Sequence, residues 1–296
     1  MRILVTGSHG LIGSALVPAL ARAGHDVVPV VRGPAGPGEI TWEPALGVLD
    51  ASQLERIDGA VHLAGEGIAD KRWTSAQKQR ILESRTASTD LLARRLAEVR
   101  PSVLVSGSAV GFYGDRGDEM VDESSPPGTG FLADVCRQWE AATAPAEQAG
   151  IRVVHARTGI VLSTDGGALK KQLGLFKSGL GGKLGTGRQY QSWISIDDEV
   201  GAIVHALTTP SLAGPVNLTA PHPVTNAELT EILGLVLHRP TLVSAPSFGL
   251  SLALGKELAA EMLLAGQRVM PRKLESSGYS FQHPELEKAL RAILGK

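Results

Sequence analysis

The sequence has one cysteine, no large excess of charge and no long apolar run. A single thiol, Cys136, excludes an internal disulfide bond. The 29 Lys and Arg residues nearly balance the 30 Asp and Glu residues, so the charge does not indicate binding to nucleic acid or to an anionic membrane. No uncharged apolar run approaches the roughly 18 residues of a membrane helix, and the segment MRILVTG lacks the features of a signal peptide. We therefore expect a cytoplasmic protein without nucleic acid or membrane partners.

Short β-branched runs alternate with helix-length segments in the first half of the chain. Such alternation is typical of repeated βα units, and nearly continuous apolar strands are typical of a parallel sheet covered on both faces. The sequence therefore predicts an α/β protein, a doubly wound parallel-sheet Rossmann fold with a smaller C-terminal substrate lobe. The expected strands are 2–6, 26–31, 60–64, 102–107 and 151–156, and the expected helices are 11–24 and 74–99.

The pattern changes after Ser163, where the chain becomes rich in glycine. We expect the dinucleotide-binding Rossmann domain to comprise residues 1–164, with a return of the chain to it around 194–220. Residues 165–296 should then form mainly the smaller substrate or partner lobe.

Three local signals refine this division. Helices are expected at 227–237 and 247–264 in the smaller lobe, and Thr225 with Glu228 matches a capping box at the start of the first. Pro145 lies inside an otherwise helical segment, so it predicts a kink or a break there.

The stretch LVTGSHGLIG places three glycines at the junction of the first strand and the first helix. Gly7 permits a tight turn, Gly10 lets the backbone approach a pyrophosphate, and Gly13 allows the helix and strand to pack closely. The N-terminus of the helix adds free N–H groups and a partial positive charge. Because the motif follows a strand and opens a helix, it indicates a dinucleotide site rather than an ordinary glycine-rich turn.

Arg32 follows the second expected strand, where an NAD site usually has an acidic residue for the ribose 2′-hydroxyl. An arginine at this place can pair with a 2′-phosphate. The sequence therefore predicts NADP(H) as the cofactor. The alternative is a solvated surface arginine.

Several segments resemble the extended short-chain dehydrogenase/reductases. TGSHGLIG is similar to their glycine motif, HLAGE to their fourth-strand segment, VSGSAVGFYG to their fifth strand with its catalytic serine, and WISIDDEVGAIVHAL to a segment of their second lobe. The segments LAGEGIADKRWTSAQKQRILESR, GRQYQSWISIDD and MLLAGQRVMPRKLESSGYSF resemble, more narrowly, the atypical "epimerase family protein" branch, which carries a C-terminal domain of unknown function. For this branch the resemblance implies a fold and a cofactor but names no substrate.

The resemblance implies site residues only where the motifs match. The pyrophosphate would lie on Gly7, Gly10 and Gly13 and on the backbone of Leu11 and Ile12. The segment Leu63, Ala64 and Gly65 would pass under the adenosine half of the cofactor. Ser106 and Ser108 end the fifth strand, with Ser106 assigned to the cofactor and Ser108 to catalysis; the alternative for Ser108 is a hydroxyl that satisfies local backbone groups.

The catalytic Tyr and Lys of the family, four residues apart on one helix, have no counterpart in GTGFLADVCRQWEAA. With Glu140 as the reference position, the corresponding pair is Leu132 and Cys136, and a shift by one residue restores neither. Tyr113 is then the candidate proton donor beside Ser108, with Glu66, Arg72 and Arg85 as further polar residues. No metal-ligand spacing involves the histidines, which are better interpreted as neutral packed imidazoles.

Two functions fit these observations. The first is an NADP(H)-dependent reductase or epimerase-like enzyme that acts on a small or nucleotide-linked substrate. The second is a redox-silent NADPH-binding sensor or regulatory protein, which tolerates the loss of Tyr and Lys. The retained Ser108 and Tyr113 favour the enzyme. The sequence leaves the oligomeric state open, and a homodimer is among the assemblies that fit it.

Overall fold

The computed structural model describes residues 1–296 and contains a seven-stranded parallel sheet with the order β11-β7-β5-β4-β1-β2-β3. The sheet is doubly wound, because the chain moves outward from β1 first in one direction and then in the other. The predicted strands are all present, with small differences at their ends. The seven strands are β1 (Arg2–Thr6), β2 (Asp26–Val31), β3 (Ile40–Thr41), β4 (Gly59–His62), β5 (Val103–Ala109), β7 (Arg152–Thr158) and β11 (Gly214–Leu218).

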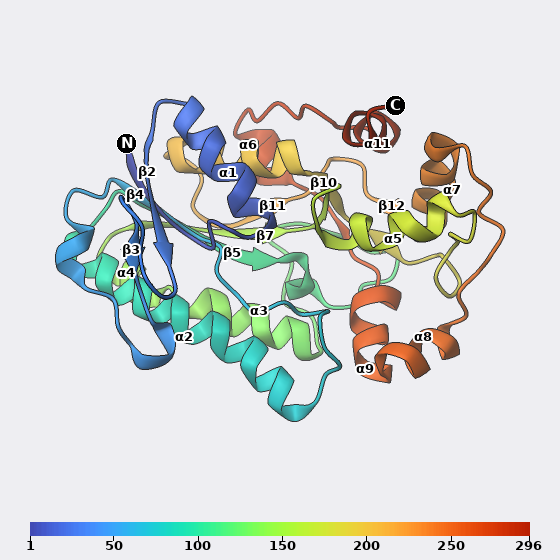
Figure 1. Cartoon of the computed structure of the whole chain (residues 1–296), viewed down its shortest axis with the longest axis horizontal. Coiled ribbons are helices and arrows are strands. Elements are labelled where there is room, and N and C mark those ends of the chain that lie inside the picture. The colour runs from blue at the N-terminus through green and yellow to red at the C-terminus, as the bar shows by residue number, and fades with distance from the viewer.

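Helices cover both faces of this sheet (Figure 1). One face carries α1 (Leu11–Arg22) and α6 (Ile196–Thr208), which contact each other. The other face carries α2 (Ser75–Val99), α3 (Phe131–Ala141) and α4 (Ala144–Gln148). The predicted α/β doubly wound architecture is therefore confirmed.

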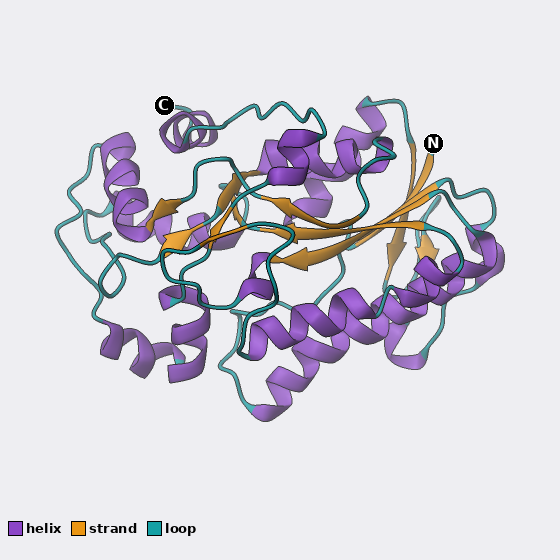
Figure 2. Cartoon of the chain, turned by 180° about the vertical axis from the view of Figure 1, so that it is seen from behind, coloured by secondary structure: helices purple, strands orange, loops and turns teal.

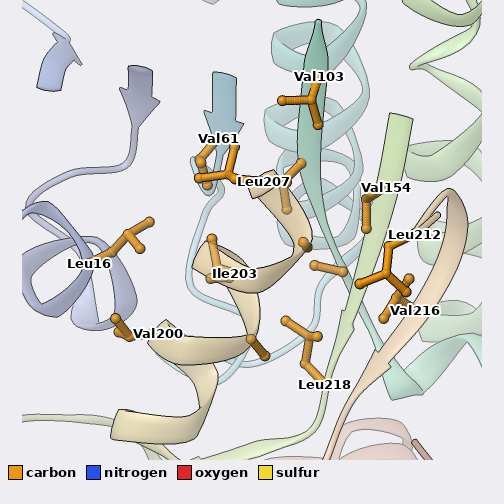
Figure 3. Close-up of a cluster of buried hydrophobic side chains, with 14 of the residues drawn as sticks. Leu16, Val61, Val103, Val154, Val200, Ile203, Leu207, Leu212, Val216 and Leu218 are labelled. Atoms are coloured by element: carbon orange, nitrogen blue, oxygen red, sulfur yellow. The ribbon is translucent and has the colours of Figure 1, made fainter. Parts of the chain in front are cut away.

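The apolar residues of the strands alternate between two cores, as the pleat of a strand requires. Val103 and Val105 of β5 join a cluster with α1 and α6, whereas Leu104 joins a cluster with α2 and α4. Figure 3 shows the first cluster, in which Ile203 and Leu207 of α6 lie over the sheet. These two buried layers hold the strands in place, and with them the carboxyl ends of the strands, where the candidate site lies.

The C-terminal part adds a smaller group of elements beside the sheet (Figure 2). Its core combines α5, α7 and α11 with Trp193. The strands here are paired as β10-β8, β12-β9 and β13-β6. The bounds are β6 (Met120–Val121), β8 (Ile160–Leu162), α5 (Gly167–Lys177), β9 (Tyr190–Gln191), β10 (Trp193–Ser195), β12 (Val224–Thr225), α7 (Asn226–Leu237), α8 (Ser247–Leu254), α9 (Lys256–Ala259), β13 (Arg268–Val269), α10 (Arg272–Ser276) and α11 (Leu286–Leu294).

Short helical turns complete the chain, as η1 (Pro44–Leu46), η2 (Ala51–Leu54), η3 (Val110–Tyr113) and η4 (Ala260–Leu264). None of the helices combines the length and the apolar character needed to cross a membrane. The position of α6 and β11 on the large sheet supports the proposed return of the chain to the Rossmann domain around 194–220.

The local signals have clear outcomes. The capping box of Thr225 and Glu228 is formed at the start of α7, and the helix breaks before Pro145, between α3 and α4. The prediction of a single helix at 247–264 is wrong. Gly255 interrupts it with a φ of +98°, a conformation that favours glycine, and the chain continues as α9 and η4.

Candidate functional site

The glycine turn between β1 and α1 is built as its motif predicts. Gly7 has a φ of +69°, and a Cβ on it would lie 2.8 Å from the carbonyl carbon of Leu63. A Cβ on Gly13 would lie 2.1 Å from the carbonyl oxygen of Gly7. Gly10 is different, because its Cβ would meet only the Gly7 oxygen, at 3.2 Å. Gly7 and Gly13 are therefore required by the packing of the protein, whereas a Cβ at Gly10 would make a single tight contact that a small shift relieves.

The N-terminus of α1 has hydrogen-bond donors to spare. Gly10 is its N-cap and supplies no side chain. The N–H of Gly10 donates to the Gly7 carbonyl, and the next backbone N–H with a protein acceptor is that of Ser14, to the carbonyl of Gly10. The N–H groups of Leu11 and Ile12 donate to no protein group. Unsatisfied donors at a helix N-terminus form a ready site for a phosphate. These residues therefore fit the pyrophosphate of a dinucleotide.

The neighbouring strand ends border the same edge of the sheet. Arg32 follows β2 and is exposed. Leu63 and Ala64 follow β4, and their N–H groups lie 3.2 and 3.4 Å from the Thr6 hydroxyl, while Gly65 is exposed. The edge thus has exposed backbone, and it has an exposed cation at Arg32 that a dinucleotide with a 2′-phosphate needs.

His62, the last residue of β4, is buried behind this segment. Its Nδ1 lies 2.7 Å from the Thr6 hydroxyl, and its Nε2 lies 3.3 Å from the Ser88 hydroxyl. Burial lowers the pKa of His62 to about 3. This histidine is therefore a neutral packed imidazole, as the sequence indicates.

Ser108 lies near the carboxyl end of β5 and is only 5% exposed. Its hydroxyl donates to Oε1 of Glu140, on α3, over 2.6 Å. Arg157 of β7 donates to both carboxylate oxygens of Glu140, from Nε and Nη2, each over 2.8 Å. The bidentate ion pair fixes Glu140, and Glu140 in turn fixes the direction of the serine hydroxyl.

Tyr113 lies in the interior beside this ion pair. The residue is fully buried, its hydroxyl donates to Oδ1 of Asn217 over 2.8 Å, and it accepts from Nη1 of Arg157 over 3.0 Å. Burial raises the pKa of Tyr113. These contacts favour a role in supporting Arg157, so the predicted role of Tyr113 as proton donor needs its own test.

One face of α3 shows which residues stand in place of the missing Tyr and Lys. Leu132, Cys136 and Glu140 follow one another at intervals of four residues, which places them on one side of the helix. A Cβ on Gly111 of η3 would touch Leu132 at 3.5 Å and Cys136 at 3.8 Å. Burial raises the pKa of Cys136 to about 12, so the thiol is not a nucleophile. Glu140 is then the one polar residue of this face that reaches Ser108.

The remaining polar candidates have separate positions. Ser106 is fully buried in β5, and its hydroxyl lies 3.5 Å from the carbonyl of Gly107. Arg72 donates to the carbonyls of Leu252 and Ala253, both at the end of α8. The Arg85 guanidinium lies 5.1 Å from the centroid of the Trp139 ring. No group of three or more His, Cys, Asp or Glu residues lies together as a metal site would require.

Sequence reasoning missed the two charges that orient Ser108. Glu140 is only a reference position in the family motif, and Arg157 lies outside the motifs. Two signals are present in the sequence. His155 and Arg157 lie two residues apart in a strand, so they share a face, and Glu140 lies in the helical segment that comes before that strand, on the first of its two helices, α3. Polar residues at alternate positions of a central strand need partners, and Glu140 is the partner of Arg157.

Comparison with known proteins agrees with this geometry. Residues 3–218 match the NAD dependent epimerase/dehydratase family, and residues 245–293 match a domain of unknown function, DUF1731. An epimerase family protein of Mycobacterium bovis is 48% identical over 289 residues, which cover 97% of this chain and 96% of that protein. The human epimerase family protein SDR39U1 is 38% identical over 300 residues, covering 99% of this chain and all of that protein.

Two solved structures are also similar. A crystal structure of human SDR39U1 (isoform 2) with NADPH superimposes with a TM-score of 0.92 at 37% identity, and each chain is covered completely. A nucleoside-diphosphate sugar epimerase from Corynebacterium glutamicum gives a TM-score of 0.83 at 40% identity, covering all of this chain and 58% of that one.

Proposed function

Because the chain belongs to the NAD dependent epimerase/dehydratase family, we propose that it is an NADP(H)-dependent enzyme of the short-chain dehydrogenase/reductase type. One observation carries the proposal. The N-terminus of α1 offers unpaired N–H groups, at Leu11 and Ile12, on the edge of the sheet where Ser108 also lies. Ligands bind at this edge in doubly wound proteins.

The cofactor would be held by backbone and by one cation. Leu11 and Ile12 would donate to the pyrophosphate, Gly10 would leave room for it, and Arg32 would pair with the 2′-phosphate. The segment Leu63 to Gly65 would lie against the adenosine half, with Ser106 buried next to it in β5. The structure of human SDR39U1 with NADPH supports the choice of cofactor.

Ser108 would contact the substrate. Its hydrogen points to Glu140, so its oxygen lone pairs are free to accept a hydrogen bond. This arrangement suits a substrate hydroxyl, which donates to Ser108 while the carbon that bears it faces the cofactor. The bound cofactor supplies hydride chemistry, and the chain supplies orientation and a route for the proton.

The substrate class follows from the family and from one similar structure. A small or nucleotide-linked alcohol or carbonyl compound fits the family, and the 40% identity to a protein named as a nucleoside-diphosphate sugar epimerase supports the nucleotide-linked alternative. The C-terminal elements beside the sheet would contact this substrate.

The apolar face of α3 favours a second candidate function. Leu132 and Cys136 pack on η3 where the family has its catalytic pair, so the chain is also suited to bind NADPH without redox chemistry, as a sensor. A sensor would show tight cofactor binding and no hydride transfer.

Two measurements test the proposal. Native mass spectrometry of the gently purified protein should find NADP(H), together with any retained substrate. Single-turnover experiments should then follow the absorbance of NADPH as metabolites are added. Oxidation of NADPH by one of them supports the enzyme; tight NADPH binding without oxidation by any compound supports the sensor; and failure to bind NADPH contradicts both.

A further inference from the structure

The ion pair below Ser108 continues away from the site. Glu140 lies at the end of α3, Thr143 at the N-cap of α4 and Glu147 within α4, and all three approach His155 of β7. His155 and Arg157 share a face of β7, so Glu140 contacts Arg157 at one end of this group and faces His155 at the other. The polar groups therefore form a row under α3 rather than an isolated pair.

The distances along the row are short. The Ser108 hydroxyl lies 2.6 Å from Oε1 of Glu140, and Oε2 of Glu140 lies 3.9 Å from Nδ1 of His155. Nε2 of His155 lies 2.9 Å from the Thr143 hydroxyl and 3.6 Å from Oε1 of Glu147. The separation between Glu140 and His155 needs a shift of about 1 Å to become a hydrogen bond. The separation between His155 and Glu147 is bridged by the Thr143 hydroxyl, which lies 3.3 Å from Oε1 of Glu147.

Burial changes along the row from one end to the other. The side chains of Glu140 and His155 are 11% and 10% exposed, whereas that of Glu147 is 49% exposed. Thr143 is fully buried. The row thus begins at the interior site and ends at the solvent.

The hydrogen bonds also give the row a direction. Thr143 donates to the carbonyl of Glu140 over 2.7 Å, which leaves its oxygen to accept from Nε2–H of His155. In this tautomer Nδ1 is unprotonated and faces the carboxylate of Glu140. His155 can therefore take a proton at Nδ1 and release another from Nε2.

We propose that Ser108, Glu140 and His155 form a proton relay between the substrate and the solvent at Glu147, and that the enzyme catalyses net alcohol oxidation or carbonyl reduction rather than epimerisation. This inference rests on the proposed function. It replaces the missing Tyr and Lys with groups from α3 and β7. Glu140 and His155 are residues that act through Ser108.

The protons and electrons balance along this route. In oxidation, the alcohol carbon loses a hydride to NADP⁺, and the O–H bond breaks as its proton moves to Ser108. The Ser108 proton moves to Oε1 of Glu140, and a half-turn of the protonated carboxyl brings it to Nδ1 of His155. The Nε2 proton of His155 moves to the Thr143 hydroxyl, whose own proton moves to Glu147 and from there to the solvent. Reduction is the reverse and takes up one proton from solvent. An epimerase returns the same proton to its substrate and needs no exit, so an exit favours net redox chemistry.

The charges around His155 decide when the relay carries a proton. Glu140 of α3 and Glu147 of α4 favour its protonated form, whereas Arg157 of β7 and Lys273 of α10 disfavour it. Burial has the largest effect, and the pKa of His155 is lowered. The imidazole is therefore neutral at rest, which leaves Nδ1 free to receive a proton.

The test uses the whole chain, NADPH and a reducible substrate. This substrate comes from a screen of metabolites, to which 9,10-phenanthrenequinone is added as one further candidate. A pH indicator follows proton uptake while absorbance follows NADPH. His155→Gln should slow NADPH oxidation by about 10², and it should shift the pH profile and raise the solvent deuterium isotope effect. His205→Gln, a partly buried histidine on α6 that bonds to Ser277, is the control.

Glu147→Gln tests the exit without threatening the fold, because this side chain is half exposed. The variant should lower the rate at low buffer concentration, and added buffer should restore it, since buffer can exchange protons at the surface. Glu98→Gln is the matched control, with a carboxylate that is 50% exposed on α2. A purely structural role for Glu147 predicts no dependence on buffer.

Each outcome decides between the proposals. An active protein whose His155 and Glu147 variants keep the rate, pH profile and isotope effect overturns the relay but leaves the enzyme in place. Interconversion of two epimers without net NADPH oxidation overturns the assignment to net redox chemistry. A protein that binds NADPH but oxidises it with no compound overturns the proposed enzyme, and the relay with it.

Discussion

Gly13 of α1 lies so close to Gly7 of the preceding turn that a Cβ on Gly13 would stand 2.1 Å from the Gly7 carbonyl oxygen. The same oxygen accepts the N–H of Gly10, so it cannot move away without losing that bond. Two backbone segments are therefore in contact where most helices have side chains between themselves and the neighbouring strand.

Gly13→Ala should destabilise the fold. The methyl group must displace backbone rather than a flexible side chain, so we expect a loss of about 1–3 kcal/mol of unfolding free energy, as for overpacking in a core. Urea denaturation measures it. Gly174→Ala in α5, where a Cβ would meet no atom within 4 Å, is the control and should be neutral or more stable by up to about 1 kcal/mol. Equal stability of the Gly13 variant and the control would contradict the packing argument.

Gly10→Val should separate binding from folding. The new Cβ would meet one protein atom, the Gly7 oxygen at 3.2 Å, so a shift of a few tenths of an ångström should accommodate it and the fold should survive. The branched side chain would fill the space assigned to the pyrophosphate. Fluorescence titration with NADPH should therefore show no binding, while circular dichroism remains that of the unchanged protein. A folded variant with the original NADPH affinity would remove the cofactor from this turn.

Arg32→Ala should remove the preference for NADPH over NADH. Each hydrogen bond from the guanidinium to a 2′-phosphate is worth about 1.5–3 kcal/mol, so the unchanged protein should bind NADPH at least tenfold more tightly than NADH. The variant should bind both alike, with an NADH affinity close to the original. Calorimetric titration gives both affinities, and Arg22→Ala, which removes an exposed arginine from the same lobe, controls for net charge. Equal affinities in the unchanged protein would overturn the assignment.

These sites differ in how far the sequence predicts them. The glycine turn could be predicted because its requirements are local, a positive φ at Gly7 and close contact at Gly13. The environment of Ser108 could not, because it depends on how α3 lies on β5 and β7. The N-terminus of α3 is a similar case: Glu261, from the C-terminal region, accepts its N–H groups at Phe131 and Leu132, and nothing near those residues in sequence points to it.

Tyr113→Phe distinguishes support from catalysis. The ring would keep its contact with Phe112, but Asn217 and Arg157 would each lose a buried hydrogen-bond partner. We expect a loss of about 1–3 kcal/mol of unfolding free energy and a fall in turnover of less than about tenfold. A fall of the roughly 10² to 10⁴ that acid–base catalysis contributes would instead make Tyr113 the proton donor. Single-turnover oxidation of NADPH, with urea denaturation in parallel, measures both effects.

Glu199 of α6 should make stability depend on pH. It is fully buried, accepts one bond from the Thr158 hydroxyl over 2.8 Å and has no partner at Oε2, and burial raises its pKa to about 8. The pH dependence follows from comparison with the unfolded chain, in which this carboxyl titrates near its usual value of about 4.3. Between these two pH values the folded state holds a proton that the unfolded state has lost. The contribution of Glu199 to the free energy of unfolding therefore falls as pH rises, by up to about 1.4 kcal/mol per pH unit, and it stops falling above pH 8. Glu199→Gln, which is neutral at every pH and can still accept from Thr158, should be more stable than the unchanged protein at pH 7.5, and the difference should shrink at pH 5.5. Urea denaturation at both pH values measures this, with Glu231→Gln on the exposed side of α7 as the control. The same pH dependence in the Glu199 variant and the unchanged protein would show that Glu199 is not the group responsible.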